Sequence, residues 1–150
     1  MRVEVLQRSG QAIAELSLDP GELAQVRLSM VLETEGQTEL VRESPGLSTS
    51  VWRWLSGHGP VCARVVAVGP RARLLLAPAV PGELRRLDLP SEGWMLPEAA
   101  LVAASHDVDL ALERGAVASV FEAVGTRLLR ARAGGSLLLA SFGGLAPLEL

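Results

Sequence analysis

The sequence predicts an all-β protein, built as a two-repeat β-sandwich or a short double-stranded β-helix with one or two short helices. Two observations predict this fold class. Many short apolar segments alternate with turns rich in Pro and Gly, which is typical of sandwiches and β-helices. The apolar runs LLLA at 74–77 and LDL at 87–89 also recur as LLLA at 137–140 and LEL at 148–150. Because a repeat indicates duplicated structure, we expect one domain, 1–150, with two β repeats at about 1–86 and 87–150.

The first segments predict strands joined by turns. Residues 3–6 favour a short strand, and residues 12–18 alternate with a period of two, so Ala12, Ala14, Leu16 and Leu18 share one face. Asp19-Pro20-Gly21-Glu22 predicts a turn, because Pro presets φ and Gly accepts a positive φ. Residues 23–32 are expected to form one continuous strand with Val26, Leu28, Met30 and Leu32 in phase. After Glu35-Gly36, residues 37–42 are expected to pair back on it.

The middle of the chain predicts a short helix and then further strands. Ser48 or Ser50 can cap a helix at about 49–55, which ends before Gly57-His58-Gly59-Pro60. Residues 61–68 are apolar and β-branched, which indicates a central strand. Residues 74–77 and 84–89 then predict two more strands, separated by a Pro81-Gly82 turn.

The second half predicts the same order of elements. A strand is expected at Trp94, residues 101–102 stand where 30–31 stood, and 106–112 favour another strand. Residues 116–124 are expected to be the counterpart of the short helix. Residues 128–133 and 136–141 are expected to form a hairpin around Gly134-Gly135, since Gly pairs favour primed turns.

Composition points to association. Hydrophobic residues make up 49% of the chain and aromatic residues only 3%, and the mean hydropathy is +0.30. A well-filled core is one interpretation. The other is that part of the apolar surface lies between subunits, since large exposed apolar patches mark interaction sites.

Charge and cysteine content limit the partners and the cellular compartment that we expect for this protein. The formal net charge is -3, and all fourteen basic residues are Arg, so nucleic-acid binding is not expected. No apolar run reaches the roughly 18 residues of a membrane helix, and no targeting segment is indicated at the N-terminus. With Cys62 the only cysteine, no internal disulfide can form, and we expect a cytoplasmic protein.

Two segments resemble a known family. Residues 73–89 (RLLLAPAVPGELRRLDL) and 135–150 (GSLLLASFGGLAPLEL) are similar to the repeats of the "altered inheritance of mitochondria", or mitochondrial biogenesis, family. The opening RSGQ at 8–11, LDPGE at 18–22 and the Trp94 strand resemble that family too. Two turns depart from its usual pattern: RLSM at 27–30 replaces a Pro-Gly-Ala turn, and EAA at 98–100 replaces a Gly-Ala pair. These departures put in doubt any ligand that the turns would carry.

The resemblance carries its own implications. It implies a fold like that of the tryptophan RNA-binding attenuation protein, with two repeats per chain, and assembly into rings, with trimers of six pseudo-equivalent units favoured. Most bacterial members have no assigned activity, while mitochondrial relatives are linked to inner-membrane organisation. The family supplies no catalytic residues.

No catalytic, cofactor-binding or metal-binding residue is predicted. His106 and the carboxylates of Asp107 and Asp109 form the best local metal cluster, but alternation on a strand points the imidazole away from both carboxylates. His58 and Cys62 stand four residues apart across a Gly-Pro turn, and that spacing does not ensure the hydrogen-bond reach of a nucleophile pair. Gly134-Gly135-Ser136 lacks the Lys of a phosphate loop.

The candidate interaction residues are Trp52, Trp54 and Leu55. On a helix, Trp52 and Trp54 point roughly 200° apart, so they cannot both face one core. One of them is then free to contact a neighbouring subunit, a membrane surface or a protein partner, since Trp anchors often dominate interfaces. Packing of both rings under a loop is the other interpretation.

The leading functional hypothesis is therefore a non-enzymatic, ring-like homo-oligomer, a trimer by preference, that acts as a scaffold or interaction protein without a cofactor. Its protein partner is unknown. The alternatives are an RNA-binding ring, which rests on fold analogy alone, and a small-molecule-binding β module with a site between repeats or subunits.

Overall fold

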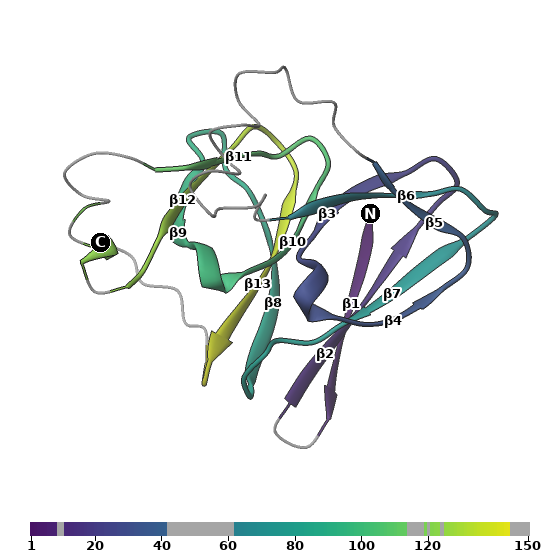
Figure 1. The fold of residues 1–150 in the computed structure, drawn as a ribbon, viewed down its shortest axis with the longest axis horizontal. Coiled ribbons are helices and arrows are strands. Elements are labelled where there is room, and N and C mark those ends of the chain that lie inside the picture. The colour runs from purple at the N-terminus through teal and green to yellow at the C-terminus, as the bar shows by residue number, and fades with distance from the viewer. Residues whose placement is uncertain (9–10, 42–61, 114–118, 120, 124, 145–150) are drawn as a thin grey trace.

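The computed structural model describes residues 1–8, 11–41, 62–113, 119, 121–123 and 125–144 (Figure 1). Within these ranges the regular elements are strands and two 3-10 turns, apart from the helical residues Ser119, Phe121 and Glu122. The first half contains β1 (Arg2–Arg8), β2 (Gln11–Leu18), β3 (Leu23–Val26), η1 (Leu28–Met30), β4 (Val31–Glu35), β5 (Thr38–Val41), β6 (Ala63–Ala67) and β7 (Ala72–Leu76). The second half contains β8 (Gly82–Asp88), β9 (Trp94–Pro97), η2 (Glu98–Ala100), β10 (Leu101–Ser105), β11 (Asp109–Leu112), β12 (Leu128–Arg132) and β13 (Ser136–Phe142).

The strands form three antiparallel sheets, so the all-β prediction is confirmed. Their orders are β1-β2-β7-β4, β5-β6-β3-β10-β13-β8 and β11-β12-β9. In Figure 1 the four-stranded sheet lies to the right and the three-stranded sheet to the left, with β8, β10 and β13 between them. The six-stranded sheet joins the two halves of the chain, because β3 of the first half pairs with β10 of the second.

The two halves follow the same order of pairing. In the first, β7 lies between β2 and β4, and β6 lies between β3 and β5; in the second, β13 lies between β8 and β10, and β12 lies between β9 and β11. Even one irregularity recurs. The register of β4 on β7 shifts after Val31↔Leu76, and the register of β10 on β13 shifts after Leu101↔Leu139.

Two apolar cores lie on either side of β10 and β13. The first core gathers the buried face of β2, predicted from its alternation, with β3, β6 and β7, and it also takes Val102 and Leu138 from the second half. The second core contains Leu101, Leu137 and Leu139 with the buried residues of β9 and β12. Successive β13 side chains thus enter opposite cores, as the period of two requires.

Several local predictions are confirmed. The turn at 19–22 forms, with the Glu22 N–H donating to the Asp19 carbonyl at 2.9 Å and Gly21 at φ +77°. The central strand at 61–68 is β6, which lies between β3 and β5. In the predicted helix at 116–124, the described residues Ser119, Phe121 and Glu122 are helical, but Ala123 is in a turn. The helix predicted at 49–55 lies outside the described residues.

Three predictions of strand continuity are wrong. Residues 23–32 are not one strand, because η1 interrupts them and turns Leu28 and Leu32 into solvent. Residues 37–42 do not pair back on β4; β5 pairs with β6 instead. The 128–133 and 136–141 segments are not a hairpin, because β12 and β13 join different sheets. In each case the local pattern indicated extended segments, but the pairing between segments distant in the sequence differed from the pairing expected.

Candidate functional site

The residues predicted as interaction anchors, Trp52, Trp54 and Leu55, lie outside the described residues, as does His58. The metal hypothesis at residues 106–109 assumed one strand, but β11 begins only at Asp109, and His106 and Asp107 lie in the preceding turn. Within the described ranges, no three His, Cys, Asp or Glu side chains gather closely enough to hold a metal ion. No helix in those ranges is long and apolar enough to cross a membrane.

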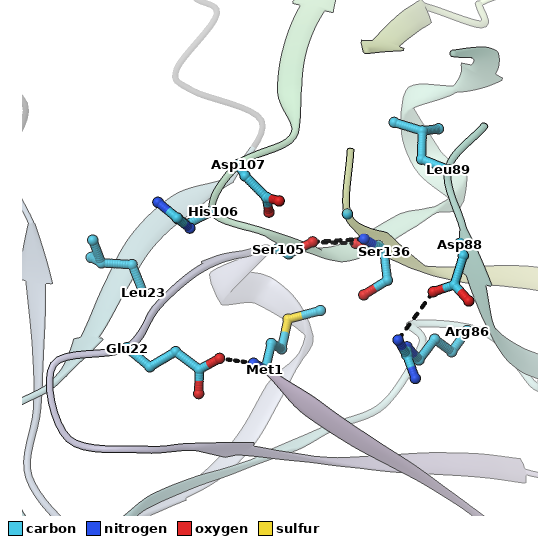
Figure 2. A pocket seen from close by; sticks show the side chains of 11 residues that line it. Met1, Glu22, Leu23, Arg86, Asp88, Leu89, Ser105, His106, Asp107 and Ser136 are labelled. Carbon is cyan, nitrogen blue, oxygen red and sulfur yellow. Dashed lines mark hydrogen bonds and ion pairs between the residues drawn. The ribbon is translucent and has the colours of Figure 1, made fainter. Parts of the chain in front are cut away.

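A cavity of about 540 Å³ lies beside the pairing of β3 with β10. Figure 2 shows that its lining comes from segments far apart in the sequence. These are the N-terminal residue, the segment that leads into β3, the end of β8, the turn after β10, and the start of β13. The size is within the roughly 300–1,000 Å³ range of small-molecule sites.

Two ion pairs already balance charges around this cavity. The Met1 ammonium pairs with the Glu22 carboxylate, whose other oxygen accepts the Asp19 N–H at 3.0 Å. The Arg86 guanidinium pairs with Asp88 at 3.0 Å. The second pair is exposed, so it contributes little to stability, but it leaves neither charge unbalanced.

The turn after β10 is held against the start of β13. The Ser136 N–H donates to Ser105 Oγ at 2.7 Å, and that hydroxyl donates to the Ser136 carbonyl at 3.2 Å. Gly135 has φ +125°, and a Cβ there would lie 2.4 Å from Ser105 Oγ and 2.9 Å from Asp107 Oδ1. Only Gly accommodates both the conformation and the close approach. The Asp107 carboxylate therefore lies close to the backbone of Gly135, beside the cavity.

Gln25 fixes the same turn from the other side. Its side-chain amide is buried and donates to the Ser105 carbonyl at 3.2 Å and to the Val108 carbonyl at 2.6 Å. Sequence reasoning passed over this residue. Its signal was a polar amide within an apolar strand, which in a buried position must find hydrogen-bond partners.

A second polar cluster bridges the two halves near the β3–β10 pairing. Glu98, the first residue of η2, binds Arg127 through Oε2 at 2.6 Å and lies 3.8 Å from Arg27, which also donates to the Glu98 carbonyl. Cys62 lies beside this cluster. Burial raises the pKa of the Cys62 thiol to about 11, with Arg27 lowering it and Glu98 raising it. A thiol of this kind is a poor nucleophile, which agrees with the prediction that Cys62 is a packed side chain.

Six strands end a sheet within the described chain, and two of them, β4 and β9, hold the places that correspond to the internally paired β10 and β3. β4 is the last strand of the four-stranded sheet, and β9 is the last strand of the three-stranded sheet. Both edges carry exposed apolar side chains: Leu32 on β4 is 62% exposed and Met95 on β9 is 52% exposed. Open edges with apolar side chains are places where another chain can pair.

Comparison with known proteins gives a family and a fold. The sequence model of the family described as "Mitochondrial biogenesis AIM24" matches residues 3–150. The chain is similar to the crystal structure of a Streptococcus pyogenes protein, with a TM-score of 0.74 and 21% identity over 95% of this chain. The matched part spans 65% of that protein's length. No curated protein matches.

Proposed function

The chain belongs to the mitochondrial biogenesis AIM24 family, and we propose that it is a non-enzymatic scaffold that assembles with copies of itself. The β4 edge of one copy pairs with the β9 edge of the next. The observation that carries the proposal is the internal pairing of β3 with β10. By the order of pairing, β9 corresponds to β3 and β4 corresponds to β10, so the two open edges are the same kind of surface as the two that already pair.

The proposal divides the chain into two related units, β1 to β7 and β8 to β13, and the matching sheet orders and register shifts support this division. The expected boundary near residue 86 falls inside β8, so the division lies before Gly82 instead. Within the chain, the edge of the first unit meets the edge of the second. Each chain then retains one open edge of each type, and a contact between copies repeats the internal junction.

The exposed side chains support such a contact. Val102 on β10 is fully buried in the first core, whereas its counterpart Leu32 on β4 is largely exposed. If β4 pairs with β9 of another copy, Leu32 enters that copy's second core in the same manner. Removing such a side chain from water contributes about 1.5–3 kcal/mol.

The charges on β4 and beside β9 are complementary. β4 presents Glu33 and Glu35, while β12, the neighbour of β9, presents Arg130 and Arg132. Glu35 pairs with Arg73 at 3.5 Å and Arg130 pairs with Glu113 at 2.5 Å, so one carboxylate and one guanidinium remain for the partner among these four. The opposite charges of β4 and of β12, which lies next to the β9 edge, favour head-to-tail contact over contact between identical edges.

Because the two edges differ, the contact is heterologous, and it closes into a ring where the rotation allows. A trimer with six related units is the ring we favour. The partner of each copy is then another copy, and the outer surface of the ring is available to further proteins. This arrangement accounts for the high apolar content of a chain of 150 residues.

Size-exclusion chromatography with light scattering tests the proposal. The expected mass for the wild type is that of three chains of 15.8 kDa each. The double variant Leu32→Glu, Met95→Glu should elute as a folded monomer, because a charge on each edge opposes pairing. The matched control is Val80→Glu, which changes an apolar side chain of similar exposure (48%) outside both edges and should stay oligomeric. A wild type that remains monomeric at micromolar concentration would contradict the proposal.

A further inference from the structure

We propose that Leu28, in η1 of one copy, lies against Pro97, at the end of β9 of the next copy, and that this apolar contact selects the partner edge. The contact rests on the proposed function, to which it adds the register of β4 on β9 and the residues that determine specificity. The pairing of β3 with β10 inside the chain serves as its template.

The two halves align residue by residue around their 3-10 turns. η1 begins at Leu28 and η2 begins at Glu98. The residue before each turn, Arg27 or Pro97, has an extended backbone. Because the register shifts of β4 and β10 follow their turns at the same distance, the two segments correspond one to one. Leu28 therefore corresponds to Glu98, and Pro97 corresponds to Arg27.

Inside the chain these positions make a polar contact. The Arg27 guanidinium donates to the Glu98 carbonyl and lies 3.8 Å from the Glu98 carboxylate. The Arg27 N–H also donates to the Val102 carbonyl at 2.9 Å. The side chains of Arg27 and Glu98 are 19% and 13% exposed. An apolar residue in place of either one would leave a largely buried polar group with fewer hydrogen bonds, which is costly.

On the two open edges the same positions are apolar and exposed. Leu28 is 48% exposed, and Pro97 is exposed as well. When β4 of one copy pairs with β9 of the next in the register that β10 has on β3, Leu28 of the first copy lies against the Pro97 ring of the second. Both side chains then leave water, which is favourable for apolar surface.

Polar positions thus meet inside the chain, and apolar positions meet between copies. This arrangement opposes two wrong pairings. If β4 paired with β3 of another copy, Leu28 would lie beside Arg27, and if β10 paired with β9 of another copy, Glu98 would lie beside Pro97. Each of these would bury a charge against an apolar side chain without its partner. Mismatches of this kind are a common source of specificity.

A second position follows the same rule. Gln25 on β3 donates to the Ser105 and Val108 carbonyls in and after β10. By the same correspondence its counterpart on β9 is Met95, which is 52% exposed and has no donor. The turn after β10 is therefore satisfied by β3 and not by β9. The thioether of Met95 suits the apolar contact between copies instead.

Pro97 also limits the strength of the contact. Between copies, the Leu32 carbonyl takes the place of the Val102 carbonyl, and Pro97 takes the place of the residue that donates to it inside the chain. Because Pro has no N–H, that hydrogen bond is missing between copies. Copies should therefore separate more readily than the two halves of one chain.

Moving the internal polar contact to the junction between copies tests the inference. Leu28→Glu places a carboxylate on η1, and Pro97→Arg places a guanidinium and an N–H on β9. Analytical ultracentrifugation over a range of concentrations gives the concentration at which half of the protein is assembled. Leu28→Glu should raise this concentration about tenfold or more, because it buries an unpaired charge. Pro97→Arg should lower it again by about tenfold or more in that background, but not in the wild type, where Leu28 offers no acceptor.

Two control variants show whether the rescue requires opposite charges at these two positions. Leu28→Arg with Pro97→Arg has the same new N–H but like charges, and it should stay dissociated. Leu28→Glu with Val80→Arg has the net charge of the rescued variant but places the Arg outside both edges, and it should stay dissociated too. Circular dichroism first establishes that each variant is folded. Because Leu28 is exposed in the single chain, its free energy of unfolding should stay nearly unchanged.

The outcomes separate this contact from the assembly itself. An oligomeric wild type in which Pro97→Arg has the same effect with Leu28 as with Leu28→Glu would overturn the contact and leave the assembly standing. Rescue by the like-charged pair or by Val80→Arg would overturn it in the same way. A monomeric wild type would overturn both proposals.

Discussion

β4 and β10 hold the same place in their sheets but have opposite surroundings. Each pairs with the central strand of its own half, and each has a register shift after its first residue. Four residues of β10, from Leu101 to Ala104, are fully buried, whereas four residues of β4, from Leu32 to Glu35, are exposed. The difference arises because the side of β10 that faces away from β13 pairs with β3. The side of β4 that faces away from β7 pairs with no strand of the described chain.

The comparison teaches that the place of a strand in the order of pairing does not set its burial. The sequence of each strand fits its environment. β10, with the sequence LVAAS, has mostly small and apolar side chains, while β4, with the sequence VLETE, has a Glu at its third and fifth positions. Charged residues on an open edge discourage unspecific pairing. Leu32 is the exception to that rule, and it is the residue on which the proposed contact between copies depends.

The largest expected effect distinguishes Leu138 on β13 from Leu75 on β7, which occupy matching registers opposite Ala103 and Glu33. Leu138 is fully buried in the first core, and Leu75 is half-buried on an outer face. Leu138→Ala should lower the free energy of unfolding by about 2–5 kcal/mol, the usual cost of a buried cavity, as measured by urea titration.

The companion variant Leu75→Ala should cost clearly less, measured on the monomeric Leu32→Glu, Met95→Glu background so that association does not contribute. Equal losses in Leu138→Ala and Leu75→Ala would mean that the two faces are equally buried. That result would contradict the contrast between the junction inside the chain and the open surface.

A smaller effect is expected at the first residue of each 3-10 turn. Glu98 in η2 binds Arg127 in its own half and Arg27 in the first half, while Leu28, the first residue of η1, is 48% exposed. Glu98→Gln leaves the largely buried Arg27 without its carboxylate, so we expect a loss of about 1.5–3 kcal/mol in urea unfolding. Leu28→Gln should change the same quantity by no more than about 0.5 kcal/mol. A loss in Leu28→Gln as large as in Glu98→Gln would contradict this assignment.

The smallest effect concerns Cys62, whose thiol pKa is raised from 9.0 to about 11, first by burial. Because the folded state favours the neutral thiol, this group stabilises the fold below pH 9 and loses that contribution as the pH rises through 11. Alkylation by iodoacetamide at pH 8 should be about 100-fold slower than in the denatured chain.

Glu98→Gln should accelerate the alkylation, since the Glu98 charge raises this pKa. Rates that are equal in the folded and denatured chain would show that the thiol is as free to ionise as in water. That outcome would place Cys62 outside the cluster that bridges the two halves.

The sequence predicted the strands better than it predicted which strands pair with each other. The alternation of residues 12–18 gave the buried face of β2 correctly, because one face of that strand meets one core. The continuous apolar run of β13 did not reveal that Leu137 and Leu138 enter different cores. A strand buried on both faces has no alternation from which its neighbours could be deduced, so the hairpin of 128–133 with 136–141 was a wrong inference.

The cavity was less accessible to sequence reasoning than the fold. Its residues come from the N-terminal residue, the segment leading into β3, the end of β8, the turn after β10 and the start of β13, and no spacing in the sequence connects them. Asp107 drew attention only as a metal ligand on a presumed strand. The hydrogen bonds of Gln25 and Ser105 place it in a turn instead.

The sequence by itself determined that this is an all-β chain with a repeated apolar motif, since alternation, Gly/Pro turns and self-similarity are local properties. Only the tertiary structure decided that β3 meets β10, that β4 and β9 keep open edges, and that Asp107 lies over Gly135 beside a cavity. These are contacts between distant segments, and their energy depends on which surfaces the whole chain brings together.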